Sequence, residues 1–181
     1  ETMAKCYIRY ETMQKFAELR ECSSLPELMG LISEAEEFKN FHCRNDQKKQ
    51  LEEINKHDGI RFKISKKAGT GGWTTARKVM CLVQANVAGC PIDNFSLKSE
   101  ANGICEVALR ICAAVYEVSV SMSLFSSAAR AKKLHAAIKQ QAWEDDSCRV
   151  LQQLKGIGEA NAKKLLGNNL TINNLSSLTI P

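Results

Sequence analysis

Apolar residues recur three or four positions apart over most of this chain. That period is expected where one face of an α-helix packs against a core. One helix should begin at Ser24, which can cap its free amides, with Pro26 in the first turn. Glycine and proline at Gly89 and Pro91 should end another. The pattern predicts helices near residues 10–19, 24–35, 45–55, 75–88, 96–120 and 123–143.

One stretch departs from helical spacing. Residues 60–64 alternate apolar and basic side chains, which is typical of a short strand. The glycine-rich segment 69–72 that follows lacks the Gly-Lys-Ser/Thr ending of a phosphate-binding P-loop. We therefore interpret it as a linker.

The helical pattern predicts an all-α fold, a bundle with short connections and a C-terminal helix–hairpin–helix. We expect two parts: a helical bundle over residues 1–147, which contains the long helix of residues 96–120, and a helix–hairpin–helix module over residues 148–181. The chain has 181 residues and opens without a signal peptide. We expect it to be a segment of a longer protein.

Composition narrows the possible functions. The formal net charge of +5 is a mild excess that does not establish nucleic-acid binding. No stretch approaches the roughly 20 apolar residues of a membrane-spanning helix, so we expect no membrane partner. The eight cysteines include no C-x-x-C pair, and the three histidines are scattered. We therefore expect structural thiols in a reducing compartment, no metal site and no catalytic residues.

The most specific local motif is the run from Val150 to Leu165, which predicts helix, Gly-Ile-Gly turn and helix. Such a hairpin presents backbone amides at the start of its second helix, where the helix dipole favours an anion. The candidate phosphate-binding residues are Lys155, Gly156, Gly158, Lys163 and Lys164. The alternative is a hairpin that only packs against the bundle.

The long helix carries Arg110 on the flank of its apolar stripe. Glu106 lies four residues earlier, so one interpretation is an exposed ion pair between the two. The other is that Arg110 contacts a nucleic-acid strand. The pattern alone favours the ion pair.

Five segments, in order, resemble one family. They are Lys5 to Met13, Ser33 to Phe38 with Arg44 after it, Val79 to Ala85, Leu134 to Trp143, and Leu154 to Gly158. Together they are similar to the Sec-sixty-three-type domain that follows the motor and winged-helix domains of superfamily-two helicases. The opening segment most resembles the meiotic crossover helicase branch.

The resemblance implies that residues 96–120 form a "ratchet" helix across an unwound strand, with Arg110 as a contact. At Ala101, Asn102 and Gly103 the chain departs from archaeal relatives, which carry basic residues there, so we expect no contact at these positions. The implied function is a non-catalytic accessory domain of a nuclear, meiotic DNA helicase that contacts single-stranded or branched DNA. ATP and magnesium would belong to motor domains outside this chain.

The implied partners are DNA, the motor and winged-helix domains of the same chain, and proteins of meiotic recombination or of the mismatch-repair type. The alternative function is a protein-interaction platform on a DNA or RNA helicase.

Overall fold

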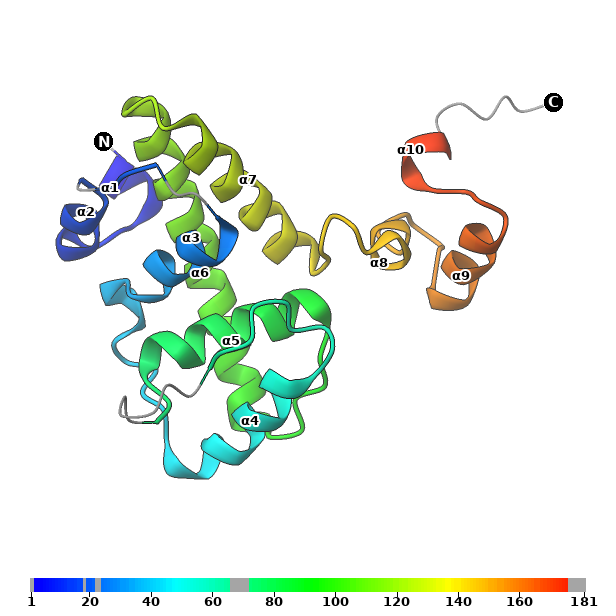
Figure 1. Cartoon of the computed structure of the whole chain (residues 1–181), viewed down its shortest axis with the longest axis horizontal. Coiled ribbons are helices and arrows are strands. Elements are labelled where there is room, and N and C mark those ends of the chain that lie inside the picture. The colour runs from blue at the N-terminus through cyan, green and yellow to red at the C-terminus, as the bar shows by residue number, and fades with distance from the viewer. Residues whose placement is uncertain (1, 18, 22–23, 66–71, 176–181) are drawn as a thin grey trace.

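A computed structural model describes residues 2–17, 19–21, 24–65 and 72–175 (Figure 1). The described chain is all-α, and its residues form no strand. Its helices are α1 (Thr2–Cys6), α2 (Tyr10–Ala17), α3 (Leu25–Ser33), α4 (Lys48–Lys56), α5 (Thr75–Ala88), α6 (Phe95–Ser121), α7 (Phe125–Gln140), α8 (Ser147–Leu151), α9 (Glu159–Gly167) and α10 (Ile172–Leu175). Two 3-10 turns, η1 (Glu36–Phe38) and η2 (Asn45–Gln47), precede α4.

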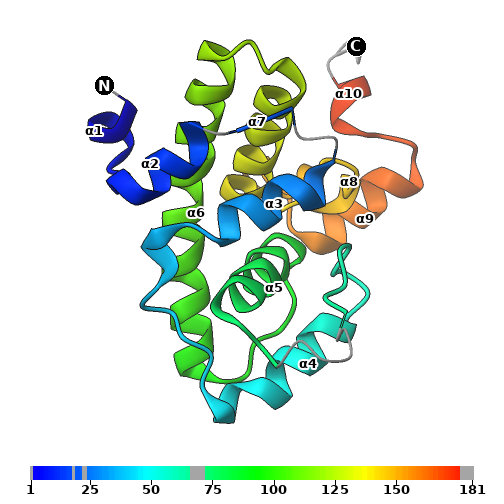
Figure 2. The ribbon, with the colours of Figure 1, turned by 60° about the vertical axis from the view of Figure 1, so that its left-hand side comes forward.

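The long helix α6 is the centre of the bundle. It packs against α1, α2, α3, α5, α7 and η1, and Figure 2 shows it running the height of the molecule beside α7. Its buried side chains are small or branched, which lets five other helices approach it closely. Burial on several sides leaves α6 only a narrow exposed face.

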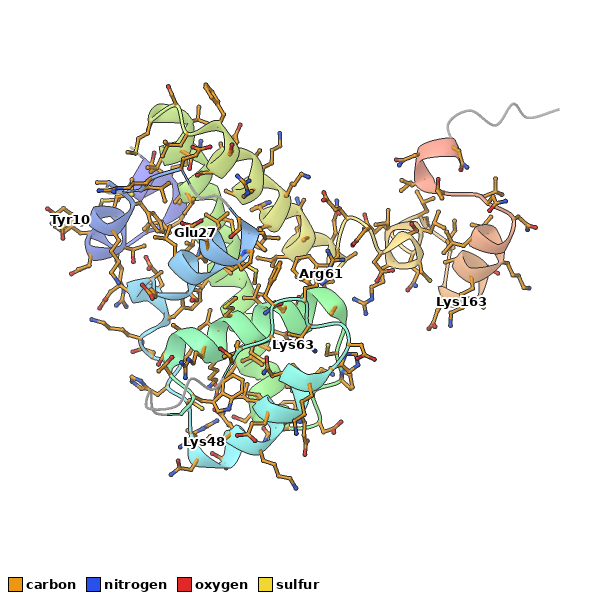
Figure 3. All side chains as sticks on the ribbon, viewed as in Figure 1. Tyr10, Glu27, Lys48, Arg61, Lys63 and Lys163 are labelled. Carbon is orange, nitrogen blue, oxygen red and sulfur yellow. The ribbon has the colours of Figure 1, made fainter. Side chains whose placement is uncertain are left out.

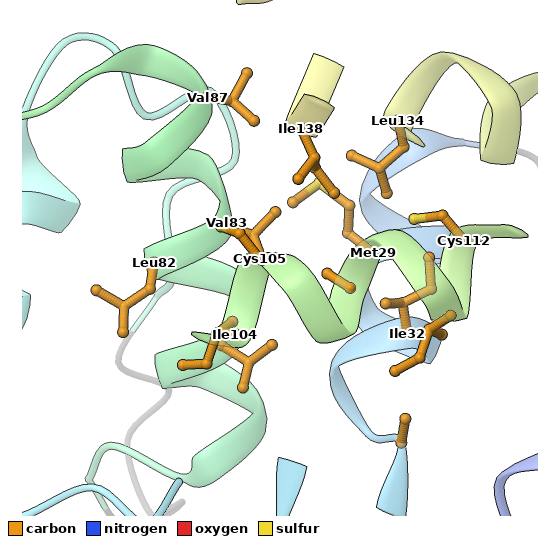
Figure 4. Close-up of a cluster of buried hydrophobic side chains, with 14 of the residues drawn as sticks. Met29, Ile32, Leu82, Val83, Val87, Ile104, Cys105, Cys112, Leu134 and Ile138 are labelled. Carbon is orange, nitrogen blue, oxygen red and sulfur yellow. The ribbon is translucent and has the colours of Figure 1, made fainter. Parts of the chain in front are cut away.

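The core lies where α3, α5, α6 and α7 meet (Figure 4). Met29 and Ile32 come from α3, and Leu134 and Ile138 from α7. All four are at most 3% exposed. Cys105 and Cys112, seven residues apart on α6, are buried in the same cluster, as expected for cysteines that act as small apolar side chains.

The helix ends follow the capping chemistry of the sequence. The Ser24 hydroxyl accepts a hydrogen bond from the Glu27 amide at 3.4 Å, which caps α3 as predicted. Gly89 ends α5 with a φ of 61°, a left-handed conformation that favours glycine. By contrast, α7 ends at Gln140, three residues before the predicted boundary, because Gln141 adopts a φ of 51°. The connection then turns Trp143 into the core.

The prediction of a strand over residues 60–64 was wrong. The apolar side chains do point inward, since Ile60 is 1% exposed and Phe62 packs against the core. However, the backbone of this segment forms its hydrogen bonds with side-chain amides rather than with a neighbouring strand. Gln84 accepts from the Phe62 amide at 2.8 Å and donates to its carbonyl at 3.1 Å. Asn55 makes the same pair of bonds to Ile64, at 2.9 and 3.0 Å.

Helices α8–α10 extend from the end of α7, away from the N-terminus (Figure 1). Arg149 of α8 ties them to the bundle by donating to the carbonyls of Val87 at 3.1 Å and Gln141 at 2.7 Å. Leu151 and Ala162 are fully buried between α8 and α9, outside the main core. The glycine-rich linker, apart from Gly72, lies outside the described residues, as do residues 176–181. Within the described ranges, no helix combines the length and apolar character needed to cross a membrane.

Candidate nucleic-acid interface

Arg110 lies on the exposed face of α6. That face is a narrow stripe at helical spacing, formed by Ser99, Asn102, Glu106 and Arg110. The guanidinium donates a long hydrogen bond, 3.4 Å, to the carbonyl of Tyr7, just after α1. No ion pair joins Arg110 to Glu106 in the described chain, so the exposed-pair interpretation was wrong. Arg110 is exposed and lies beside the end of α1.

The surroundings of Arg110 carry charges of both signs. Glu106 is exposed one turn away, and Glu117 further along α6 forms an ion pair with Lys5. The hydrogen bond from Lys5 holds the pKa of Glu117 below its ordinary value. Over its whole length α6 carries two cations and three carboxylates. Helix α6 by itself therefore offers a phosphate no continuous basic track.

Residues 101–103, where no strand contact is expected, differ in their burial. Ala101 is 1% exposed, and a side chain added at Gly103 would approach the Phe41 ring at 3.7 Å. Only Asn102 of the three is exposed. Ala101 thus faces the protein interior, and Gly103 is half-buried with room for a small side chain.

The Gly-Ile-Gly turn joins α8 to α9 and lies on the surface. Gly156 has a φ of +87°, so a side chain there would be strained. Gly158 is the residue before α9 and has an ordinary φ of −83° with open space around it. Sequence reasoning gave both glycines the same role, but the turn requires glycine only at 156.

The start of α9 is open but not uniformly positive. No side chain caps its first amides. Glu159 occupies the first turn and binds Lys163 of the next turn at 2.6 Å. This hydrogen bond from Lys163 lowers the pKa of Glu159 and raises that of Lys163. Lys155 and Lys164 are exposed and form no ion pair within the described residues.

The structure separates the two predicted contact regions. Arg110 binds beside α1, whereas Lys163 lies on α9 at the opposite end of the molecule (Figure 3). The views in Figures 1 and 2 agree on this separation of α1 from α9. The candidate residues therefore form two sites rather than one.

Sequence reasoning missed a buried polar network at the start of α6. The ammonium of Lys78 is fully buried and donates to the His42 carbonyl at 3.0 Å, to Gln47 at 2.8 Å and to the carboxylate of Glu100. Glu100 also accepts from Arg44 at 2.7 Å and Gln47 at 3.0 Å. Lys78 shares a helical stripe with Leu82 and Ala85, which was the available signal.

This network explains one motif residue of the family pattern. Arg44 donates to both Ser96 and Glu100, so it fixes the start of α6 to the segment before η2. Burial alone would raise the pKa of Glu100, but hydrogen bonds from Lys78 and Gln47 and the nearby cations bring it below its ordinary value. Arg44 therefore positions α6.

The thiols in the described chain are all free. Burial raises the pKa of Cys105 and of Cys112 to about 12. Such thiols are protonated and poor nucleophiles. Among the described residues, no group of three or more histidine, cysteine or acidic side chains could hold a metal ion.

Comparison with known proteins gives a consistent family. Residues 1–180 match the family described as "Sec63 Brl domain". The chain is 30% identical over 169 residues to "ATP-dependent DNA helicase homolog MER3" of Arabidopsis thaliana, which covers 90% of this chain and 15% of that protein. It is 29% identical to "Probable ATP-dependent DNA helicase HFM1" of Homo sapiens, covering 93% of this chain and 12% of the relative.

A third relative is "Activating signal cointegrator 1 complex subunit 3" of Dictyostelium discoideum, which is 25% identical over 95% of this chain and 8% of its own length. The chain thus spans between 8% and 15% of the length of these curated relatives. The family expected from the five sequence segments is confirmed: the chain belongs to the Sec63 Brl domain family.

Proposed function

We propose that this chain is a non-catalytic accessory domain of a nuclear, ATP-dependent DNA helicase and contacts single-stranded or branched DNA during unwinding. The observation that carries the proposal is the surface turn at Gly156, which leads into the uncapped start of α9 between Lys155 and Lys164. Backbone amides at a helix start bind phosphate oxygens without regard to base identity. Membership of a family whose relatives are named DNA helicases supports it.

The predicted residues would act as two separate contacts. Lys155, Gly156, Gly158, Lys163 and Lys164 would grip a phosphate at the hairpin, and Arg110 would touch the strand at the exposed face of α6. Release of Glu159 from Lys163 would free a cation for the phosphate, since the pair is exposed and therefore weak. ATP and magnesium would bind motor domains elsewhere in the parent protein, which together with its winged-helix domain would be partners of this chain.

The proposal is tested by measuring the affinity of this chain for three labelled DNAs of equal length: a single strand, a fork and a blunt duplex. We expect the single strand and the fork to bind more tightly than the duplex. Lys163→Ala/Lys164→Ala should weaken binding to all sequences alike, because phosphate contacts carry no base information. Absence of binding to all three DNAs would overturn the proposal, as would ATP hydrolysis by the purified chain.

A protein-interaction platform is the second candidate. Val120, Met122 and Phe125, at the turn between α6 and α7, are 46%, 41% and 73% exposed. Exposed apolar side chains gathered at one place are typical of protein contacts. One relative is also named as a subunit of a complex. Val120→Ser/Met122→Ser should abolish capture of a protein partner and leave DNA affinity unchanged if this candidate is correct.

A further inference from the structure

Helix α7 carries cations without any carboxylate. This helix of 16 residues carries Arg130, Lys132, Lys133 and Lys139 and no carboxylate. The net charge of α7 is therefore +4, whereas the whole chain, with 25 cations and 20 carboxylates, has a formal net charge of +5. By contrast, α6 has more carboxylates than cations. Of the helices that the structure describes, α7 thus has the largest excess of cations, whereas the long helix expected to contact the strand has a slight excess of carboxylates.

One stripe of α7 combines an aromatic ring with two of these cations. Phe125, Lys132 and Lys139 follow one another at intervals of seven residues, close to two helical turns. They therefore lie along one side of the helix, with about 10 Å between each residue and the next. All three are exposed, Phe125 by 73%. The ring of Tyr116 on α6 lies beside this stripe, 6.0 Å from the Lys132 ammonium.

The carboxylates that reach α7 bind at other positions. Glu144 pairs with Lys133 at 3.2 Å, and Glu21 accepts from the Ser126 amide at 2.6 Å. No ion pair joins Lys132 or Lys139 to a carboxylate in the ranges that the structure describes. Lys139 does stabilise the helix dipole, because it lies in the last turn. That role does not account for Lys132, which lies two turns earlier in the helix.

We propose that a single strand of DNA lies along α7, with its phosphates on Lys132 and Lys139 and a base stacked on Phe125. This surface, which rests on the proposed function, runs from the α6–α7 turn toward α8, so it points at the hairpin of the C-terminal helices (Figure 1). A basic track with exposed aromatic rings is how proteins bind single strands without reading sequence.

A protein partner fits this stripe less well. Ala129 lies on this face between Phe125 and Lys132 and is exposed. Ala136 lies about one turn after Lys132. Protein interfaces depend on large buried anchors, and beyond Phe125 at its start this stripe offers only small alanines and lysines. They do allow a phosphate backbone to approach closely, and phosphate binding needs only charge.

The test compares three variants of the whole chain by fluorescence anisotropy with a labelled oligothymidylate over a salt series. Lys132→Gln/Lys139→Gln removes the two phosphate contacts, and Phe125→Ala removes the stacking ring. The matched control is Lys49→Gln/Lys56→Gln, which removes two exposed lysines at the same seven-residue spacing from α4. Circular dichroism melting checks that each variant is folded.

Each phosphate contact contributes about 0.7 to the slope of log affinity against log salt for a single strand. Lys132→Gln/Lys139→Gln should therefore flatten the slope by about 1.4, and the α4 control should leave it close to the wild-type value. Phe125→Ala should weaken binding at least about fivefold at every salt concentration.

A wild-type chain that binds the oligonucleotide, with equal slopes for the α7 variant and the α4 control, would overturn this proposal and leave the proposed function standing. A wild-type chain that fails to bind would overturn both. Binding of an acidic peptide through Lys132 and Lys139, with no effect of these lysines on DNA affinity, would replace the strand with a protein partner.

Discussion

Removal of Glu100 from the buried Lys78–Glu100 pair should destabilise the fold more than removal of Lys78. Glu100→Ala leaves a fully buried ammonium with two neutral acceptors, His42 O and Gln47 Oε1. Removing one partner of a buried pair costs roughly 3–5 kcal/mol. Lys78→Met leaves Glu100 bound to Arg44 and Gln47, with its side chain 22% exposed, so it should cost less, roughly 1–3 kcal/mol.

Urea unfolding followed by far-ultraviolet circular dichroism measures both changes. The double variant Lys78→Met/Glu100→Leu should be more stable than Glu100→Ala alone, because no buried charge remains. Glu106→Ala is the matched control, since Glu106 is an exposed glutamate of the same helix, and it should stay within about 0.5 kcal/mol of wild type. If Glu100→Ala costs no more than Glu106→Ala, the assignment of the network as a stabilising anchor is wrong.

The remaining predictions concern the irregular segment 60–65, the Gly-Ile-Gly turn, the DNA contact at Arg110 and the stability of the chain in acid. Gln84→Ala removes both hydrogen bonds to Phe62 and should cost about 2 kcal/mol, with faster hydrogen exchange over residues 60–65. Gly156→Ala should lower thermal stability by about 1 kcal/mol because of its positive φ, whereas Gly158→Ala should be neutral; equal effects would contradict the turn geometry. Arg110→Ala should change stability by less than about 0.5 kcal/mol but weaken single-strand binding, and the reverse result would make Arg110 a structural residue. Because folding lowers the pKa of Glu100, the ionised carboxylate stabilises the folded state above its ordinary pKa of 4.5, and this stabilisation should be lost as the pH falls below that value. The stability of the Glu100→Gln variant should not show this loss when it is measured over the same acid range.

Helical spacing predicted the bundle because most of its helices are amphipathic. Ser24 and Gly89 marked helix ends through local chemistry, and both act there as expected. The strand prediction failed at residues 60–64 because the alternation of apolar and basic residues indicates which side chains are buried. It does not indicate which groups form hydrogen bonds with the backbone. Here Gln84 and Asn55, distant in sequence, supply the bonds that a neighbouring strand would give.

The candidate interface was less accessible to sequence reasoning. The four-residue spacing of Glu106 and Arg110 suggested an ion pair within α6. Instead, the guanidinium of Arg110 binds the carbonyl of Tyr7, a residue distant in sequence, which local spacing cannot predict. The two glycines of the turn look equivalent in sequence, and only the backbone conformation distinguishes Gly156 from Gly158. The four cations of α7 are visible in the sequence, but they form no motif of the kind found at the Gly-Ile-Gly turn.

The central claim is that this chain binds single-stranded DNA through its phosphates, and the salt dependence of that affinity tests it most directly. With an unstructured oligonucleotide, log affinity against log salt should fall with a slope of −1.4 or steeper at about 0.7 per phosphate, which corresponds to two or more contacts. A flat salt dependence, or no measurable binding at low salt, would contradict the claim.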